Sequence, residues 1–155
     1  YRNDFEGTIG QEWSHRATDV TPTGSRRFLG QFANDTVALT LANLPPHDKV
    51  TVSFDLFIIR TWDGNEPGVG PDVWDLRVEN GPTLLHTTFG NSRPGFSPQQ
   101  AYPGQYPGGS NPARAGALEN DTLGYTAYGL ATFGAGFDAV YSLTFTFDHT
   151  TDSIG

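Results

Sequence analysis

Apolar and polar side chains alternate in several segments of this chain, and this period of two residues predicts β-strands with one buried face. The segment Ala139–Asp148 shows it most clearly, because aromatic and aliphatic residues alternate there with Ser and Thr. The segment Lys49–Ile59 alternates too and becomes apolar on both faces near its end, so we expect that end to be covered on both sides. Further strands are predicted at Thr36–Ala42, Asp72–Glu79 and Thr83–Phe89.

Turn residues separate these strands, and no apolar period of 3.6 residues continues beyond two turns. The triplet Asn80-Gly81-Pro82 predicts a tight reversal, so the strands on either side of it should form a hairpin. Short strands with such turns, in a chain with 19 Gly and 11 Pro, predict an all-β fold. We expect a jelly-roll-like antiparallel β-sandwich that covers residues 1–155 as a single domain.

Two regions depart from this regular pattern. The stretch 91–122 is rich in Pro, Gly and Tyr, and an irregular connection of this length in a compact domain is usually functional or mobile. It could be a binding loop, or a strap over the edge of a sheet. Near the other end of the chain, His149–Ser153 has the composition of a turn and Ile154-Gly155 resembles the start of a return strand. We therefore expect the sandwich to lack its final one or two strands in this chain.

Charge and composition exclude several classes of protein. The chain has 17 Asp and Glu against 9 Lys and Arg, and its net charge of −8 disfavours nucleic acids and anionic membrane surfaces as partners. Cysteine is absent, which excludes disulfides, thiolate zinc sites and thiol catalysis. No apolar run approaches the ~20 residues of a membrane span, and no signal peptide is visible. Since the first residue is Tyr1, we expect a processed form or an excised part of a longer protein.

Oxygen-bearing side chains gather in the loop that follows the strand Lys49–Ile59. Asp63 and Asn65 flank a glycine, and Asp72 can return from the far side of the loop. Carboxylate and amide oxygens are the ligands that Ca²⁺ prefers. The spacing is not that of an EF-hand, so the pattern has two interpretations. Either these three side chains, with Glu66 or Asp75 as a further ligand, bind a cation, or they only stabilise a turn through hydrogen bonds to the backbone.

Several short motifs together resemble a family of bacterial extracellular jelly-roll domains, which are similar in outline to laminin-G-like and carbohydrate-binding modules. They are Asn3-Asp4-Phe5-Glu6-Gly7, Phe28-Leu29-Gly30, Leu44-Pro45-Pro46-His47, Phe54-Asp55 and Trp62-Asp63-Gly64. The resemblance implies a secreted or cell-surface protein. It also implies that an acidic residue near the N-terminus, Glu6 or Asp4, holds a structural Ca²⁺ ion. The alternative for Glu6 is a solvated carboxylate.

Aromatic residues of the 91–122 stretch suggest a platform for sugars. Sugar rings stack on aromatic faces, and tyrosine combines an apolar face with a polar tip. The alternative is that these rings only fix the loop to the sandwich, and Trp62 could serve in either way. The candidate residues for carbohydrate binding are Tyr102, Tyr106, Phe96, Trp62 and Arg93.

Catalysis has little support in the sequence. The chain has no Gly-x-Ser-x-Gly elbow, His-Glu-x-x-His helix, P-loop or dinucleotide-binding glycine motif. We expect a non-catalytic extracellular module of a surface, matrix or adhesive protein, stabilised by Ca²⁺. One alternative is a carbohydrate-binding module that recognises glycans through the 91–122 loop. Another is a structural subunit that assembles with neighbouring subunits by donating a strand to an open sheet edge.

Overall fold

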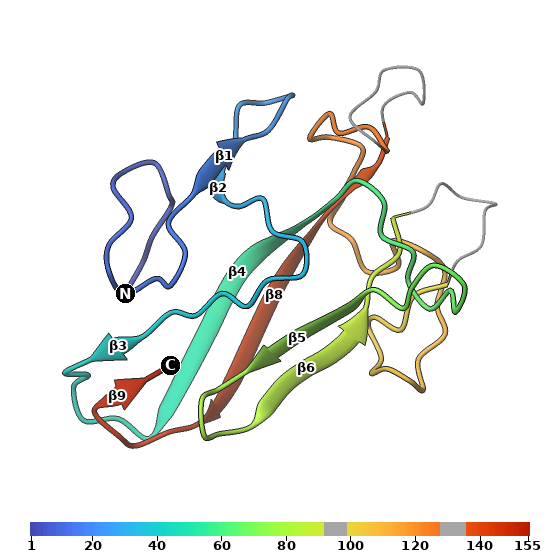
Figure 1. Ribbon diagram of the computed structural model, residues 1–155. Coiled ribbons are helices and arrows are strands. Elements are labelled where there is room, and N and C mark those ends of the chain that lie inside the picture. Colours follow the sequence, from blue (N-terminus) through green and yellow to red (C-terminus); the bar gives the residue numbers. More distant parts are fainter. Residues whose placement is uncertain (92–98, 128–135) are drawn as a thin grey trace. The chain divides into compact units, whose positions relative to one another are not determined.

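The computed structural model describes residues 1–91, 99–127 and 136–155, and the regular secondary structure of these residues is entirely β-strand (Figure 1). This confirms the prediction of an all-β fold. Among the described residues there is no helix long and apolar enough to cross a membrane. The strands are β1 (Thr18–Val20), β2 (Arg27–Leu29), β3 (Leu41–Ala42), β4 (Lys49–Ile59), β5 (Val73–Arg77), β6 (Thr83–Thr88), β7 (Glu119–Asn120), β8 (Asp138–Asp148) and β9 (Ser153–Ile154).

The chain divides into two compact units, which are described one after the other. The first unit comprises Tyr1–Thr51 and Thr146–Gly155, and the second comprises Val52–Phe145. The chain passes from one unit to the other within β4 and again within β8.

In the second unit, the hydrophobic core lies between two sheets. One sheet has the strand order β4–β8–β7, and the other is the antiparallel pair β5–β6. Both contribute to the same apolar cluster, which gives this unit a sandwich-like core. The finer prediction of a jelly roll stays a prediction. The buried members of the cluster are Ile58, Leu85, Phe89, Ala139, Tyr141 and Leu143.

The predicted hairpin is confirmed. β5 and β6 pair in antiparallel register, with Asp75 opposite His86, and Asn80 in the turn between them has a φ of 56°. Alternation along β5 places Trp74 and Leu76 towards the core, while Asp75 and Arg77 are exposed. The predicted alternation of buried and exposed residues is therefore present in this strand.

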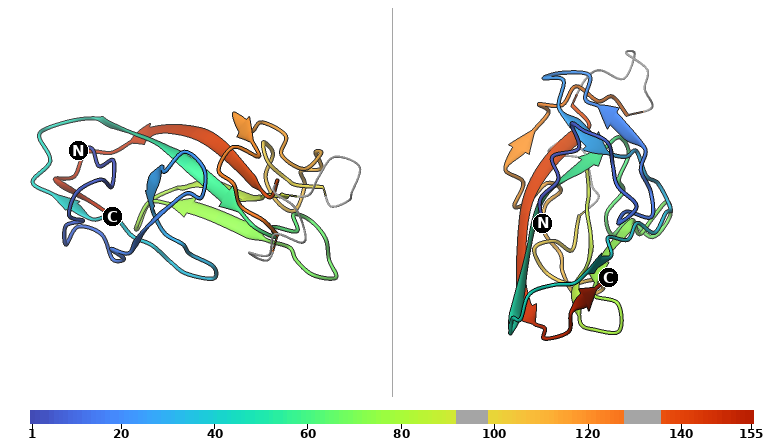
Figure 2. Two further views of the ribbon diagram at one scale, coloured as in Figure 1. Left: turned by 90° about the horizontal axis from the view of Figure 1, so that it is seen from above. Right: turned by 90° about the vertical axis from the view of Figure 1, so that its left-hand side faces the viewer.

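The two longest strands also follow their predicted bounds closely. β4 coincides with the predicted segment, and β8 begins one residue earlier than expected, at Asp138. Figure 2 shows them as a long ribbon of two neighbouring strands. Hydroxyl groups pair across the exposed face, with Thr51 Oγ1 2.8 Å from Thr146 Oγ1 and Ser53 Oγ 2.9 Å from Thr144 Oγ1. Because the partner numbers run in opposite directions, the strands are antiparallel.

Residues 99–111, which we call the strap, run along the edge of β6 that β5 leaves open. The backbone N–H of Tyr102 donates to the carbonyl of Thr88 at 3.2 Å, and that of Tyr106 donates to the carbonyl of His86 at 2.9 Å. The hydroxyl of Thr87 donates to the carbonyl of Gly104 at 2.8 Å. Of the two interpretations of this loop, the structure therefore supports a strap over a sheet edge, which protects that edge.

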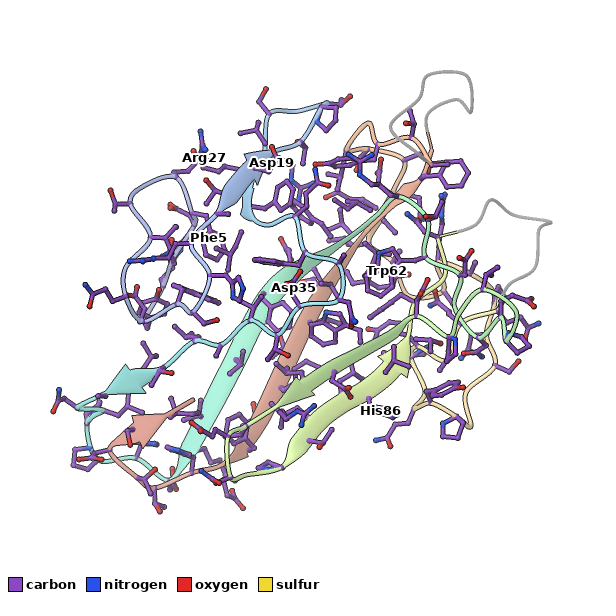
Figure 3. The ribbon with its side chains drawn as sticks, viewed as in Figure 1. Phe5, Asp19, Arg27, Asp35, Trp62 and His86 are labelled. Carbon is purple, nitrogen blue, oxygen red and sulfur yellow. The ribbon has the colours of Figure 1, made fainter. Side chains whose placement is uncertain are left out.

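In the first unit the strands are short. β1 pairs with β2, and β3 pairs with β9, both in antiparallel register. The N-terminal segment folds back so that the ring of Phe5, labelled in Figure 3, meets the ring of Trp13 edge-on at 5.5 Å.

One strand prediction needs correction. Only Leu41–Ala42 of the predicted segment 36–42 is a regular strand, and Leu39 makes a single bridge to Trp13. The alternation is nevertheless real, since Val37, Leu39 and Leu41 are half-buried and Thr36, Ala38 and Thr40 are exposed. The expected return strand begins as β9, which pairs Ile154 with Leu41.

Candidate functional site

The acidic loop, residues 62–72, follows β4 in the second unit and is anchored to the chain beyond β6. Gly64 N–H donates to the carbonyl of Phe89 at 3.0 Å, and Asn91 N–H donates to the carbonyl of Trp62 at 2.8 Å. Gly64 has a φ of +58°, and a Cβ atom there would lie 2.3 Å from the carbonyl oxygen of Gln99. Both the φ value and this close approach require glycine, so the backbone structure explains the glycine of the Asp-Gly-Asn motif.

Asp63, Glu66 and Asp72 place three carboxylates on this loop. The backbone N–H of Asp63 donates to a carboxylate oxygen of Asp72, which closes the loop across nine residues. Partial burial raises the pKa of the Asp63 carboxyl, and the negative charges of Asp72 and Glu66 raise it further. The loop therefore brings like charges close enough to repel one another, and a cation would relieve that repulsion.

The side chain of Asn65 is held by its own hydrogen bonds. Its Nδ2 donates to the carbonyl of Gly109 at 2.9 Å, and its Oδ1 accepts from the hydroxyl of Thr88. These bonds join the acidic loop to both the strap and β6. Asn65 therefore has a structural role, but these side-chain hydrogen bonds join distant segments and not the backbone of its own turn.

The four predicted metal ligands fall into two groups. Asp63, Asn65 and Asp72 belong to the acidic loop, whereas Glu6 belongs to the first unit. There the carboxylate of Glu6 lies 3.5 Å from the Arg27 guanidinium. Within residues 1–91, 99–127 and 136–155, no group of three or more His, Asp or Glu side chains is arranged so that it could hold a metal ion. Calcium binding stays a prediction.

The aromatic candidates for carbohydrate binding lie in different surroundings. Tyr102 packs into the core, with its ring centroid 5.0 Å from that of Phe89 and 5.2 Å from that of Tyr141. Trp62 packs against the same core cluster. Tyr106 lies beside His86, with 6.1 Å between ring centroids. Two further candidates, Phe96 and Arg93, lie outside the described residues.

Around Tyr106, the outer face of the hairpin carries a polar pair. His86 Nδ1 lies 2.6 Å from Asp75 Oδ1, and both side chains are more than one third exposed. Figure 3 labels His86 on β6 and Trp62 in the acidic loop. An aromatic ring beside a carboxylate and an imidazole offers both stacking and hydrogen bonding to a ligand.

Two buried polar residues, one in the strap and one after it, could not be predicted from the sequence. The Gln100 side chain is fully buried, and its Oε1 accepts from Gly90 N–H, Arg114 N–H and the Tyr141 hydroxyl. Its Nε2 donates to the carbonyls of Tyr102 and Ala115 at 3.0 and 2.9 Å. One amide thus fixes the strap to β8 and to the segment that follows the strap.

Arg114 adds a second buried connection. Its guanidinium donates to the carbonyls of Asn91 and Gly136 at 2.9 and 2.6 Å, and it lies 2.8 Å from the Asp121 carboxylate. Nothing in the local sequence marks Gln100 or Arg114 as buried, because both residue types are usually exposed. The five hydrogen bonds of the Gln100 side chain can be recognised only from the three-dimensional arrangement of the surrounding loops.

Comparison with known proteins gives no relative for this chain. No family model matches it, no curated protein matches it, and no solved structure matches it. The resemblance to bacterial extracellular jelly-roll domains therefore stays a prediction.

Proposed function

We propose that this protein is a non-catalytic module of a secreted or cell-surface protein, and that Ca²⁺ stabilises its acidic loop. The observation that carries the proposal is the closeness of Asp72 and Glu66 to Asp63. Their negative charges add to the effect of burial, and both effects raise the pKa of the Asp63 carboxyl. A divalent cation bound by these oxygens would turn repulsion into attraction. The extracellular setting rests on the resemblance described above.

The test is thermal unfolding of chelator-treated protein with and without added Ca²⁺. A ligand that binds only the folded state at about 100 times its dissociation constant adds about 2.7 kcal/mol of stability. For a chain of this size that corresponds to a rise in Tm of about 5–10 °C. Asp63→Asn and Asp72→Asn should each abolish the rise.

Asp55→Asn is the matched control, because Asp55 is an exposed carboxylate on β4 of the same unit and lies outside the acidic loop. This variant should keep the full response to Ca²⁺. An unchanged Tm of the wild-type protein in millimolar Ca²⁺ would refute the calcium proposal.

Glycan binding is a second candidate, and the position of Tyr106 beside the His86–Asp75 pair favours it. The expected ligand is a sugar that stacks on the Tyr106 ring, donates a hydroxyl to the Asp75 carboxylate and bonds to the His86 imidazole. Glycan retention on an array should be lost in Tyr106→Ala with little change in Tm. Retention by Tyr106→Ala at the wild-type level would exclude this site.

Tyr102→Ala distinguishes the two tyrosines. Its ring is part of the core cluster, so removing it should lower the free energy of unfolding by about 3 kcal/mol. Any loss of glycan retention in this variant would follow from the loss of folded protein and would not identify Tyr102 as a ligand contact.

A further inference from the structure

Two histidines that are 102 positions apart in the sequence meet in the first unit. His47 lies in the turn before β4, and His149 lies directly after β8. The Nε2 atom of His47 is 2.7 Å from the Nδ1 atom of His149, and this contact is partly buried. The distance is that of a short hydrogen bond.

The ring geometry identifies the kind of contact. The ring centroids are 5.0 Å apart and the planes differ by 13°. With the two nitrogens 2.7 Å apart, such a large centroid separation is reached only when both nitrogens lie close to the line between the centroids. The lone pair of one nitrogen therefore points at the proton of the other, as in a linear N–H···N bond. A metal ion held by both rings would need a bent arrangement, with the two nitrogens farther apart.

The outer nitrogens of the pair determine where the protons lie. His47 Nδ1 is 2.6 Å from the carbonyl oxygen of Pro45, which can only accept, so this nitrogen carries a proton. In a neutral His47 ring, Nε2 is then the acceptor, and the proton in the contact belongs to His149 Nδ1. On the other side, Thr151 donates its hydroxyl to the carbonyl of Ser153 at 2.9 Å. Its oxygen then accepts from His149 Nε2 at 3.1 Å.

All the hydrogen bonds in this series, from the Pro45 carbonyl to the Ser153 carbonyl, are satisfied when His47 is neutral and His149 is an imidazolium. A second proton would go to His47 Nε2, the acceptor in the central contact. Two N–H groups would then face each other at 2.7 Å, and two positive charges would be adjacent. Uptake of that proton must break the contact.

We propose that His47 and His149 form a proton-controlled latch, which is closed while the two rings share one proton and opens when both rings are charged. Two further hydrogen bonds join the same segments. Leu44 N–H donates to the carbonyl of Asp152 at 2.8 Å, and His149 N–H donates to the carbonyl of Asp48 at 3.1 Å. Opening of the latch weakens these bonds and with them the pairing of β9 on β3.

Four charged side chains lie close to the latch in sequence. Asp48 and Lys49 lie on the segment of His47, and Asp148 and Asp152 lie on the segment of His149. Lys49 and Asp148 are paired with each other, and Lys49 lowers the pKa of the Asp148 carboxyl, so this carboxylate stays charged across the range in which histidine titrates. β3 and β9 carry no titratable side chain. Imidazole is the side chain whose charge ordinarily changes between about pH 5 and 8.

The test is amide hydrogen exchange by NMR on the full chain, with Leu44 and His149 N–H as reporters. After correction for the intrinsic exchange rate, protection of both amides should fall about tenfold between pH 8 and pH 5. His47→Gln and His149→Gln should each remove this pH dependence. His15→Gln is the control, because His15 is an exposed histidine of the same unit that contacts Ser14, and it should keep the full response.

A measurement on the wild-type protein tests the proposal without any variant, so it applies even if a variant fails to fold. In ¹⁵N-labelled wild-type protein at pH 7, His47 Nε2 should have the chemical shift of an unprotonated nitrogen, and a coupling across the hydrogen bond should link it to His149 Nδ1. A protonated His47 Nε2 at pH 7 would overturn the latch. Equal loss of protection on acidification in the wild-type protein and in the double variant His47→Gln/His149→Gln would overturn it as well.

Discussion

At the scale of single residues, Asp63 shows how the acidic loop responds to pH. Burial, Asp72 and Glu66 all raise the pKa of its carboxyl above 3.8, so the folded protein binds this proton more tightly than the unfolded chain does. The charged form is thus unfavourable at neutral pH. The penalty disappears as the pH falls through the raised pKa towards 3.8.

Asp63→Asn should therefore stabilise the calcium-free protein at pH 7. The gain is at most about 1 kcal/mol, because the Asp63 carboxylate is only partly buried and solvent still screens its charge. Urea unfolding at pH 7 and at pH 3.5 measures it, and the advantage over wild type should shrink at the lower pH. An equal advantage at both pH values would show that charge repulsion is not the cause.

At the scale of elements, the strap depends on Gln100. Replacing this residue by leucine leaves the Gly90 N–H without its buried acceptor and removes the partner of the Tyr141 hydroxyl. Each unsatisfied buried group costs about 1–3 kcal/mol, so Gln100→Leu should lower the free energy of unfolding by about 3 kcal/mol. Urea denaturation measures the change.

The neighbouring Gln99 provides the control, because it is exposed and its side chain accepts only from the Ser110 hydroxyl among the hydrogen bonds that the structure shows. Gln99→Leu should change stability by less than about 0.5 kcal/mol. Similar stabilities of the two variants would contradict the role assigned to the buried amide.

The Gln100 amide also sets the properties of Tyr141. Burial raises the pKa of Tyr141 to about 12, an effect that its hydrogen bond to Gln100 opposes. The phenol therefore stays protonated over the whole range in which the protein would act, and it serves as a donor in the core.

The elements that the sequence predicted well are those whose structure depends on alternation and turn chemistry. β4, β8 and the β5–β6 hairpin follow from apolar periodicity and from Asn80-Gly81. The segment 36–42 was predicted less well, because its alternation reflects a surface that is half-buried without continuous strand pairing.

The candidate site was predictable only in part. Asp63, Asn65 and Asp72 are close in sequence, so their gathering in one loop could be expected. The role of Tyr102 in the core, and the meeting of His47 with His149, depend on contacts between distant segments. One sequence carries no local signal for such contacts.

At the scale of the whole molecule, the net charge of −8 opposes folding. Salt shortens the range of this repulsion to about 10 Å at 0.1 M and about 3 Å at 1 M. Raising NaCl at pH 7 should therefore raise Tm. The same series near pH 4.7, the isoelectric point of the sequence, should give a smaller rise because the net charge there is close to zero.

Potassium chloride in place of sodium chloride should give the same curve, because general screening does not depend on the identity of the cation. A rise in Tm that is as large at pH 4.7 as at pH 7 would show that salt does not act through net charge.

The strap has a consequence for behaviour in concentrated solution. It occupies the hydrogen-bonding edge of β6 with backbone that contains Pro103 and Pro107, which have no N–H to offer to a further strand. Loss of the strap would leave the carbonyls of His86 and Thr88 free to accept from another molecule. Damage to this proline-rich segment, for example by proteolytic cleavage, would therefore be expected to appear first as fibril growth, before the protein loses its β-structure.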